Sequence, residues 1–434
     1  MQVSVEAAEG LVRRLSIAVP AAEIDSEVER RLKDLGRRVH LNGFRPGKAP
    51  MPMVRQRYLA QVREEVVGEV LGRSYGQAVQ EQNLRPAGSP QIESLQNEPG
   101  QDLSFVAAVE VYPEFEIGDL SKIEIERPVA EVTDADIDEM IEILRKQRAE
   151  WKPVKREAKE GDRVTVDFEG RLDGEPFDGG KGEGMPVVLG EGRILKDFEK
   201  GLMGVKADEE RKIEVTFPED YHAENLKGKT AEFTVKVTDV SEQVLPEFDD
   251  EFAKIFGTDN VDALREDVKK NMERELRQAI RRQVKNAVME GLAKVTEVDL
   301  PNALVEEESR RVRDNFVQQQ MGGRGDTNAI DPSLFKDEAE RRVRLGLIVA
   351  ELVKSADIRL DEERLEAFID DIAAAYEEPE QVKRHYKASE ELMTNARTVV
   401  IEDQVVDYVI ERAKVTDKPM SFKDVMNPAP AAAA

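Results

Sequence analysis

The sequence contains no cysteine, only three histidines and few aromatic residues, and each shortage excludes a class of function. Without cysteine there is no disulfide framework, zinc–thiolate site, iron–sulfur cluster or cysteine nucleophile. The histidines, His40, His222 and His385, are scattered along the chain and do not indicate a metal site or a catalytic triad. We therefore expect neither a metal nor a cofactor.

Long apolar runs are missing as well. No segment has the length of about 20 apolar residues that a membrane-spanning helix needs. The first residues, Met1 to Glu6, show neither the basic segment nor the apolar segment of an export signal. We expect a cytoplasmic protein without a membrane partner.

Charge, in contrast, is abundant and unbalanced. Acidic side chains number 90 and basic ones 64, so the formal net charge is −26, and charged residues make up 35% of the 434 residues. At roughly 150 residues per domain, this length indicates about three domains. The negative charge argues against nonspecific binding of the whole surface to nucleic acid. High charge with only 5% aromatic residues indicates extended helical parts rather than one compact globule.

Hydrophobic periodicity divides the chain into three regions and predicts a multidomain α+β protein. Residues 1–112 combine strand and helix patterns, which predict an α+β domain. Residues 150–245 are rich in glycine and strand alternation, which predict a mostly antiparallel β-domain. Residues 246–426 are helical almost throughout and predict an extended all-α domain.

Three smaller features complete this division. Residues 113–149 are expected to form a linker that contains a polar helix, with Thr133 as its N-cap. One short helix near Leu195–Gly201 interrupts the β-domain. The last residues, 427–434, are of low complexity and are expected to be a disordered tail.

The sign of the charge reverses in residues 28–57, where nine Lys or Arg face two acidic residues, a local net charge of +7. The turn Gly43–Pro50 lies in the middle of this segment, between two helix patterns, and its glycines and prolines favour a fixed, exposed loop. An exposed Phe44 beside Arg45 and Lys48 suits a surface that mixes protein and RNA phosphate, since the cations attract phosphate and the ring anchors on apolar atoms. On charge alone, a solvated helix face with a stiff loop remains the simpler explanation.

Aromatic residues are concentrated in the predicted β-domain. Seven of the chain's 23 aromatic residues lie between Trp151 and Val240. This concentration fits a binding pocket or a small domain core equally well. The seven are Trp151, Phe168, Phe177, Phe198, Phe217, Tyr221 and Phe233.

The turn Gly43–Pro50 resembles the G-F-R-x-G-K-x-P signature of the bacterial trigger factor family at every defined position. Its place between two helices of an N-terminal α+β unit is also the one that this family uses. The resemblance implies docking on the ribosome, on a large-subunit protein at the exit tunnel and on adjacent rRNA. The residues implied in docking are Gly43, Phe44, Arg45, Pro46, Gly47 and Lys48.

The β-domain is similar to FKBP-type prolyl isomerases in several short motifs, among them Asp167–Gly170, Phe177–Gly179 and Phe198–Leu202. It departs from small FKBP proteins at Phe168, where Tyr is usual, and at Phe198, where Trp is usual. Both positions stay aromatic, so an apolar pocket survives. By this resemblance the proline pocket is formed by Phe168, Phe177, Asp178, Met185, Ile194, Leu195, Phe198, Tyr221 and Phe233.

Prolyl isomerisation suits a chain without cysteine, because the reaction needs no nucleophile, metal or cofactor. Amide resonance sets a rotation barrier of about 18–20 kcal/mol, and no bond is broken when an X–Pro bond rotates. An apolar pocket favours the twisted amide, whose carbonyl has less charge separation than the planar form. Asp178 and the Tyr221 hydroxyl are the groups that would orient the substrate by hydrogen bonds.

The C-terminal helices carry no catalytic signature and fit either a plain scaffold or a surface for binding unfolded chains. The trigger factor resemblance covers essentially the whole chain and implies a chaperone that is partly ribosome-bound and binds nascent and unfolded polypeptides. It leaves open whether the protein forms a homodimer off the ribosome. Two alternatives are a stand-alone prolyl isomerase with helices for dimerisation, and an RNA-binding hairpin protein without a folding role.

Overall fold

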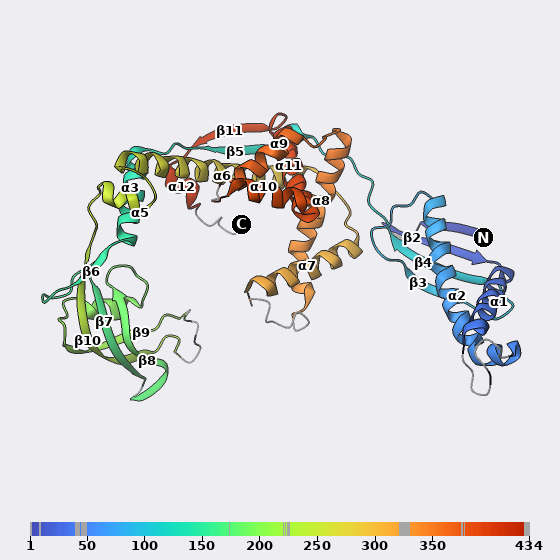
Figure 1. Cartoon of the computed structure of the whole chain (residues 1–434), viewed down its shortest axis with the longest axis horizontal. Coiled ribbons are helices and arrows are strands. Elements are labelled where there is room, and N and C mark those ends of the chain that lie inside the picture. Colours follow the sequence, from blue (N-terminus) through green and yellow to red (C-terminus); the bar gives the residue numbers. More distant parts are fainter. Residues whose placement is uncertain are drawn as a thin grey trace. The chain divides into compact units, whose positions relative to one another are not determined.

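The computed structural model describes residues 2–7, 10–39, 44, 50–172, 174–219, 221, 223, 226–320, 330–374, 376 and 378–428, with only the backbone described for Ala7 and Asp178. The chain divides into two compact units whose elements are labelled in Figure 1. One unit consists of Met1–Arg127 and Arg282–Lys418, and the other of Pro128–Arg281 and Pro419–Ala434.

The first unit begins with an α+β region, in which a four-stranded antiparallel sheet carries two helices on one face (Figure 1). Alternation along the second strand turns Leu15, Ile17 and Val19 inward, and the helical period turns Ile24, Val28 and Leu32 of the first helix toward the same core. The strands, in sheet order, are β1 (Gln2–Ala7), β2 (Val12–Val19), β4 (Leu103–Glu110) and β3 (Gln91–Gln96), and the helices are α1 (Ala21–Arg38) and α2 (Met51–Glu81).

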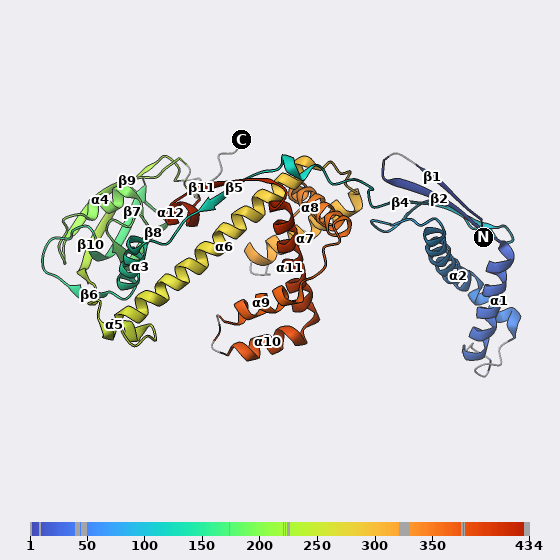
Figure 2. The ribbon, with the colours of Figure 1, turned by 90° about the horizontal axis from the view of Figure 1, so that it is seen from above.

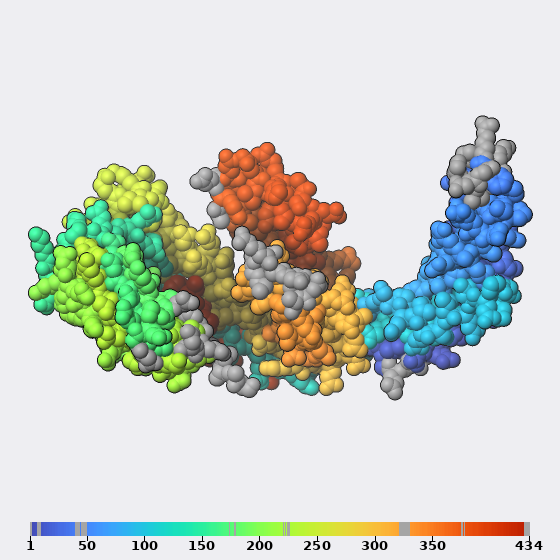
Figure 3. Space-filling model, turned by 90° about the horizontal axis from the view of Figure 1, so that it is seen from below, coloured from blue at the N-terminus to red at the C-terminus, as the bar shows by residue number. Residues whose placement is uncertain are grey.

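The same unit contains a helical region with a small core of its own. Leu365 and Ile369 of α9 pack against Ala396 and Val400 of α11. Helices α9 and α10 lie side by side, and their surface forms a lobe (Figures 2 and 3). The elements are α7 (Asn302–Gln320), η3 (Pro332–Phe335), α8 (Lys336–Ser355), α9 (Glu362–Ala373), α10 (Pro379–Ala388) and α11 (Glu390–Ile410).

One strand interrupts the region for which the sequence predicts helices only. Helix α11 ends at Ile410, and residues Lys414–Pro419 form β11, which pairs with β5 (Glu124–Val129). Ion pairs cross between the two strands, with Arg127 Nε 2.7 Å from Asp417 Oδ1. The sequence analysis did not anticipate this strand, because its partner strand lies about 290 residues earlier in the chain and no local pattern reveals it. A short helix, η1 (Leu120–Lys122), precedes β5.

In the second unit, residues 150–244 form the predicted antiparallel β-region. Its sheet runs in the order β6–β10–β7–β8, and β9 also pairs with β10. The short helix α4 packs Phe198 and Leu202 into the core of this sheet. The elements are β6 (Glu150–Pro153), β7 (Arg163–Leu172), β8 (Glu175–Val188), α4 (Lys196–Leu202), β9 (Glu210–Thr216) and β10 (Thr230–Val244).

Helices form the rest of the second unit. The predicted N-cap of α3 is confirmed: Thr133 and Asp136 form a reciprocal capping box, which satisfies two backbone donors at the helix start. Ile137 and Ile141 of α3 pack against Phe252 and Leu264. These helices are α3 (Asp134–Gln147), α5 (Asp250–Ile255), α12 (Phe422–Met426) and the first part of α6 (Val261–Val295), which continues into the first unit.

The three predicted kinds of region, α+β, antiparallel β and helical, are confirmed within the described residues. Over that same part of the chain, none of the helices combines the length and the apolar character that crossing a membrane requires.

A buried carboxylate ties the start of the β-region together. Asp162 has a side chain only 2% exposed, and its oxygens accept hydrogen bonds from the Arg156 guanidinium and from the Lys159 N–H at 2.9 Å. Arg156 also donates to Glu242 of β10 at 2.9 Å. Burial acts to raise the pKa of Asp162, but the hydrogen bonds from Arg156 and Lys159 outweigh it, and the pKa is lowered.

We expect the Asp162→Asn variant to lose about 1–3 kcal/mol of unfolding free energy at pH 7, because a buried charge-assisted network loses its charge. A carboxylate with a lowered pKa stabilises the fold above its unfolded pKa of about 3.9, and this contribution is lost as the pH falls through the folded pKa. The wild type should therefore lose more stability than the variant between pH 5 and pH 3. Urea unfolding followed by the fluorescence of Trp151, the single tryptophan, measures both.

The matched control is Glu242→Gln, which removes the more exposed partner of the same arginine. It should cost no more than about 1 kcal/mol, as exposed ion pairs do. Parallel loss of stability in the wild type and in Asp162→Asn down to pH 3 would contradict this role of Asp162.

Candidate active site and docking hairpin

Aromatic rings from separate elements meet above the sheet of the β-region, around Phe233 of β10. The ring centroid of Phe233 lies 5.4 Å from that of Phe198, 5.9 Å from Phe168 and 6.0 Å from Phe177. Phe198 and Phe177 stand edge-on to it, at interplanar angles of 89°. Such edge-to-face pairs place the positive edge of one ring on the negative face of another and add about 0.5–1.5 kcal/mol each.

Two glycines make room for these rings through the pairing of the strands. Phe233 of β10 lies opposite Gly170 of β7, and Phe168 of β7 lies opposite Gly182 of β8. A Cβ atom on Gly170 would come within 2.5 Å of Phe233 Cε1, and a Cβ atom on Gly182 within 2.5 Å of Phe168 Cε1. Each ring therefore occupies the space that its cross-strand glycine leaves open.

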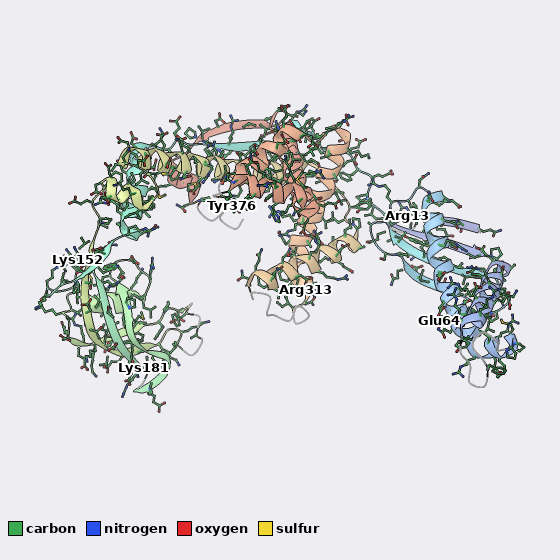
Figure 4. All side chains as sticks on the ribbon, in the orientation of Figure 1. Arg13, Glu64, Lys152, Lys181, Arg313 and Tyr376 are labelled. Carbon is green, nitrogen blue, oxygen red and sulfur yellow. The ribbon has the colours of Figure 1, made fainter. Side chains whose placement is uncertain are left out.

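These rings line an open cavity of about 590 Å³, a volume typical of small-ligand sites. The cavity brings together all of the predicted pocket residues whose side chains are described: Phe168, Phe177, Met185, Ile194, Leu195, Phe198, Tyr221 and Phe233. The side chain of Asp178, the ninth predicted residue, lies outside the described part of the structure. Lys152 on β6 and Lys181 on β8 mark opposite ends of this domain in Figure 4.

The cavity has further lining residues that sequence reasoning did not place in the pocket. Phe217 follows β9, and its ring lies 4.8 Å from that of Tyr221 and 6.1 Å from that of Phe177. Phe217 is one of the seven aromatic residues concentrated in this domain, and that concentration could have indicated it. Gly179 ends the motif Phe177–Gly179, and no comparable signal marked Arg193, Ala223 and Leu226.

The chemistry of the cavity is that of an apolar binding site. Arg193 is the only charged residue among its described lining residues, and Arg193 Nε lies 2.9 Å from Glu191 Oε2. Across the described part of the chain, no group of three or more His, Asp or Glu residues could hold a metal ion. What the lining offers a substrate is aromatic surface and shape.

The second predicted site lies between α1 and α2. Phe44 is 37% exposed, and Gly43, Arg45, Pro46, Gly47 and Lys48 lie outside the described residues. Acidic side chains of the two flanking helices neutralise part of the charge of the basic segment. Arg30 and Arg31 bind Glu27, Arg31 also binds Glu69, and Arg55 binds Glu29.

These ion pairs are strong enough to change a pKa. The hydrogen bond from Arg30 lowers the pKa of Glu27 to about 2, so this carboxylate stays ionised at neutral pH. Lys33, Arg38 and Arg57 have no ion pair within the described residues. Glu27 and Glu69 lie outside residues 28–57, so the positive charge available to a partner is smaller than +7 suggests.

Three family models match the chain. One for bacterial trigger factor protein matches residues 1–144, one for the C-terminus of that protein matches residues 260–411, and one for FKBP-type peptidyl-prolyl cis-trans isomerase matches residues 154–238. Together with the aromatic cavity on an antiparallel sheet, they define an FKBP-type prolyl isomerase domain within a larger chain.

Curated relatives and a solved structure cover nearly the whole length. The trigger factors of Thioalkalivibrio sulfidiphilus and Azotobacter vinelandii are 51% and 49% identical over 430 and 433 residues, which is 99% of this chain and 98% and 99% of theirs. A structure titled "Promiscuous Substrate Recognition in Folding and Assembly Activities of the Trigger Factor Chaperone" aligns with 95% of this chain and 99% of its own, with a TM-score of 0.51 and 20% identity, and shows the shared fold.

The chain belongs to the bacterial trigger factor family. It is a ribosome-associated chaperone that binds nascent chains, and it is a peptidyl-prolyl cis-trans isomerase of the FKBP type. Family membership decides against the two alternatives from the sequence, an isomerase without chaperone activity and an RNA-binding hairpin protein.

We expect Gly170→Ala to destabilise the β-region by about 1–3 kcal/mol, because the added methyl group overpacks against the Phe233 ring. Phe233→Leu removes the ring atoms that the methyl group would meet. The double variant should then be more stable than the sum of the two single effects predicts, by about 0.5–3 kcal/mol. Urea unfolding of the four proteins measures this coupling.

Isomerase activity should fall in all three variants, since each alters the ring at the centre of the cavity. Strict additivity of the two stability changes would show that the glycine does not accommodate the ring.

Proposed function

We propose that the aromatic cavity is the prolyl isomerase active site and binds the proline ring of an X–Pro segment. The observation that carries this proposal is the convergence of Phe168, Phe198 and Phe233 on one open cavity of about 590 Å³. A pyrrolidine ring is compact and apolar, and it has no N–H donor to satisfy. An aromatic pocket therefore binds it without leaving a buried donor unpaired.

The cavity can lower the rotation barrier by two physical means. In water, hydrogen bonds stabilise the planar amide, whose resonance separates charge between oxygen and nitrogen. Apolar walls remove this hydration and so favour the twisted amide, in which charge separation is smaller. The pocket also holds the flanking residues in a turn, so that the rotation takes place within a bound complex.

Each wall has a proposed part in this binding. Phe198 and Phe233 form the buried floor for the proline ring, and Phe168 stands beside both. Met185, Ile194 and Leu195, which are half-buried, form the wall that meets the residues around proline. For Asp178 and the Tyr221 hydroxyl we propose hydrogen bonds that orient the substrate.

We expect Phe198→Ala to reduce kcat/KM for a proline-containing tetrapeptide by about tenfold or more, since the ring contributes packing, which is worth several kcal/mol at a buried aromatic position. Suppression of aggregation of an unfolded client should change little, because most of the exposed apolar surface for such clients lies outside the cavity. Unchanged peptide turnover in a folded Phe198→Ala protein would refute the pocket assignment.

We also propose that the loop between α1 and α2 docks on a large-subunit protein at the exit tunnel and on adjacent rRNA, which places the protein in the cytoplasm. The support is the exposed Phe44 and the basic residues on both sides of the loop that have no internal acidic partner in the described structure. The acidic remainder of the chain, at a total net charge of −26, repels RNA elsewhere. Docking is thereby confined to the hairpin.

For clients, we propose that the helical region supplies exposed apolar side chains. Leu334 is 75% exposed, Tyr376 59% and Phe316 43%, and the Phe316 ring lies 5.5 Å from that of Phe335. Isolated apolar groups separated by charge bind many sequences weakly, which suits a chaperone of broad range. The same apolar groups would be available for a homodimer off the ribosome.

The proposed functional division of the chain follows the sequence: 1–112 docks, 150–245 isomerises and 246–426 binds clients, with 113–149 as the linker and 427–434 as the tail. This is a division by task. Residues of the linker pack with the helical part, since α3 contacts α5 and α6.

We expect the triple variant Phe44→Ala, Arg45→Ala, Lys48→Ala to lose ribosome co-sedimentation and to keep full peptide isomerase activity. Raised salt should weaken docking of the wild type. Removing Arg45 and Lys48 should make the slope of log binding constant against log salt concentration shallower by about one unit for each lost phosphate contact. The matched control is Lys181→Ala, Lys212→Ala, which removes two exposed cations from the β-region. Equal co-sedimentation of the triple variant and the wild type would contradict the docking proposal.

A further inference from the structure

The wall of the cavity includes a loop that has no regular secondary structure. Residues 190–195 connect β8 to α4 and contribute Arg193, Ile194 and Leu195 to the lining. Gly190 and Gly192 have φ angles of +94° and +65°, in the left-handed region that favours glycine. The local sequence therefore gives this loop freedom, and something else must fix it if the wall is to have one shape.

The two ends of the loop are fixed by backbone hydrogen bonds. Before the loop, the Leu189 N–H donates to the Asp162 carbonyl at 2.9 Å, and the Leu189 carbonyl accepts from Gly161 at 2.8 Å. After it, the Leu195 carbonyl accepts from the Glu199 N–H at 3.0 Å in the first turn of α4. Between these anchors, the loop depends on side chains.

The Glu199 side chain reaches this middle part by hydrogen bonds. Glu199 Oε1 accepts a hydrogen bond from the Gly190 N–H at 2.6 Å and a longer one from the Gly192 N–H at 3.4 Å. Glu199 directly follows Phe198, whose ring forms the floor of the cavity. The same turn of α4 thus holds the floor through Phe198 and the loop through Glu199.

We propose that Glu199 is a positioning residue for prolyl isomerisation, which fixes loop 190–195 in the conformation that binds substrate. It acts as a hydrogen-bond acceptor through one oxygen, so its charge is not required. The inference rests on the proposed assignment of the cavity as the active site.

The inference predicts a particular kinetic signature. When the loop loses its acceptor, only a fraction of the molecules has the binding-competent wall at any moment, and KM rises by the inverse of that fraction. Every bound complex still has the correct wall, so kcat is kept. Loss of the two hydrogen bonds should raise KM about tenfold. Partial unfolding, in contrast, would lower the apparent kcat in proportion to the inactive fraction and leave KM unchanged.

The test measures KM and kcat of the full chain with one chromogenic X–Pro tetrapeptide for four variants. Glu199→Ala and Glu199→Asp should raise KM about tenfold and change kcat less than about twofold, because the first has no acceptor and the second is one methylene too short. Glu199→Gln keeps an oxygen at the same place and should retain the wild-type KM. Lys200→Ala, an exposed position on the same helix, controls for helix propensity and should match the wild type.

The outcomes separate this inference from the pocket assignment. If Phe198→Ala lowers kcat/KM as predicted, either of two results would overturn the positioning role. One is a wild-type KM in Glu199→Ala, and the other is a KM in Glu199→Gln raised as much as in Glu199→Ala. A fall in kcat at constant KM, with lowered urea stability by Trp151 fluorescence, would overturn it in favour of a structural role. If Phe198→Ala turns over normally, the pocket assignment itself fails.

Discussion

The cavity depends on the packing of aromatic rings around Phe233. This ring sits over Gly170 on the neighbouring strand, and Phe168 sits in the same way over Gly182. A side chain at either glycine would push a ring into the space that a substrate needs. If this cavity is the active site, as we propose, its shape comes from the register of an antiparallel sheet, and it needs no catalytic group that must ionise. Because the reaction only rotates a bond, a rigid apolar surface of the right shape supplies what it requires.

The distribution of charge distinguishes the proposed docking hairpin from the rest of the chain. The whole chain is strongly acidic, and one hairpin is basic. Within that hairpin, Glu27, Glu29 and Glu69 bind Arg30, Arg31 and Arg55, whereas other cations of the two helices have no ion pair within the described residues. In the proposed docking, contact with a polyanion is confined to this hairpin, whose two helices pack on a sheet.

Much of this could be predicted from the sequence, and the failures have physical causes. Local periodicity predicted the strands and helices around Leu15 and Ile24, and the Thr133 cap could be recognised from its hydroxyl and the carboxylate three residues later. Strand β11 was missed because its partner is remote. Family motifs indicated the aromatic lining, but the pairing of rings with glycines depends on cross-strand register, which two irregularities between β7 and β8 shift. The anchoring of loop 190–195 by Glu199 likewise needs coordinates, since carboxylates are too abundant in this chain for any one to stand out.

The central claim is that the ring of a substrate proline lies against the rings of Phe198 and Phe233. Nuclear Overhauser effects between an X–Pro peptide and a full chain with isotope-labelled phenylalanine measure this contact directly. The account predicts cross-peaks from the proline ring protons to the rings of Phe168, Phe198 and Phe233. Cross-peaks only to rings of the helical region, such as those of Phe316 and Phe335, would contradict it.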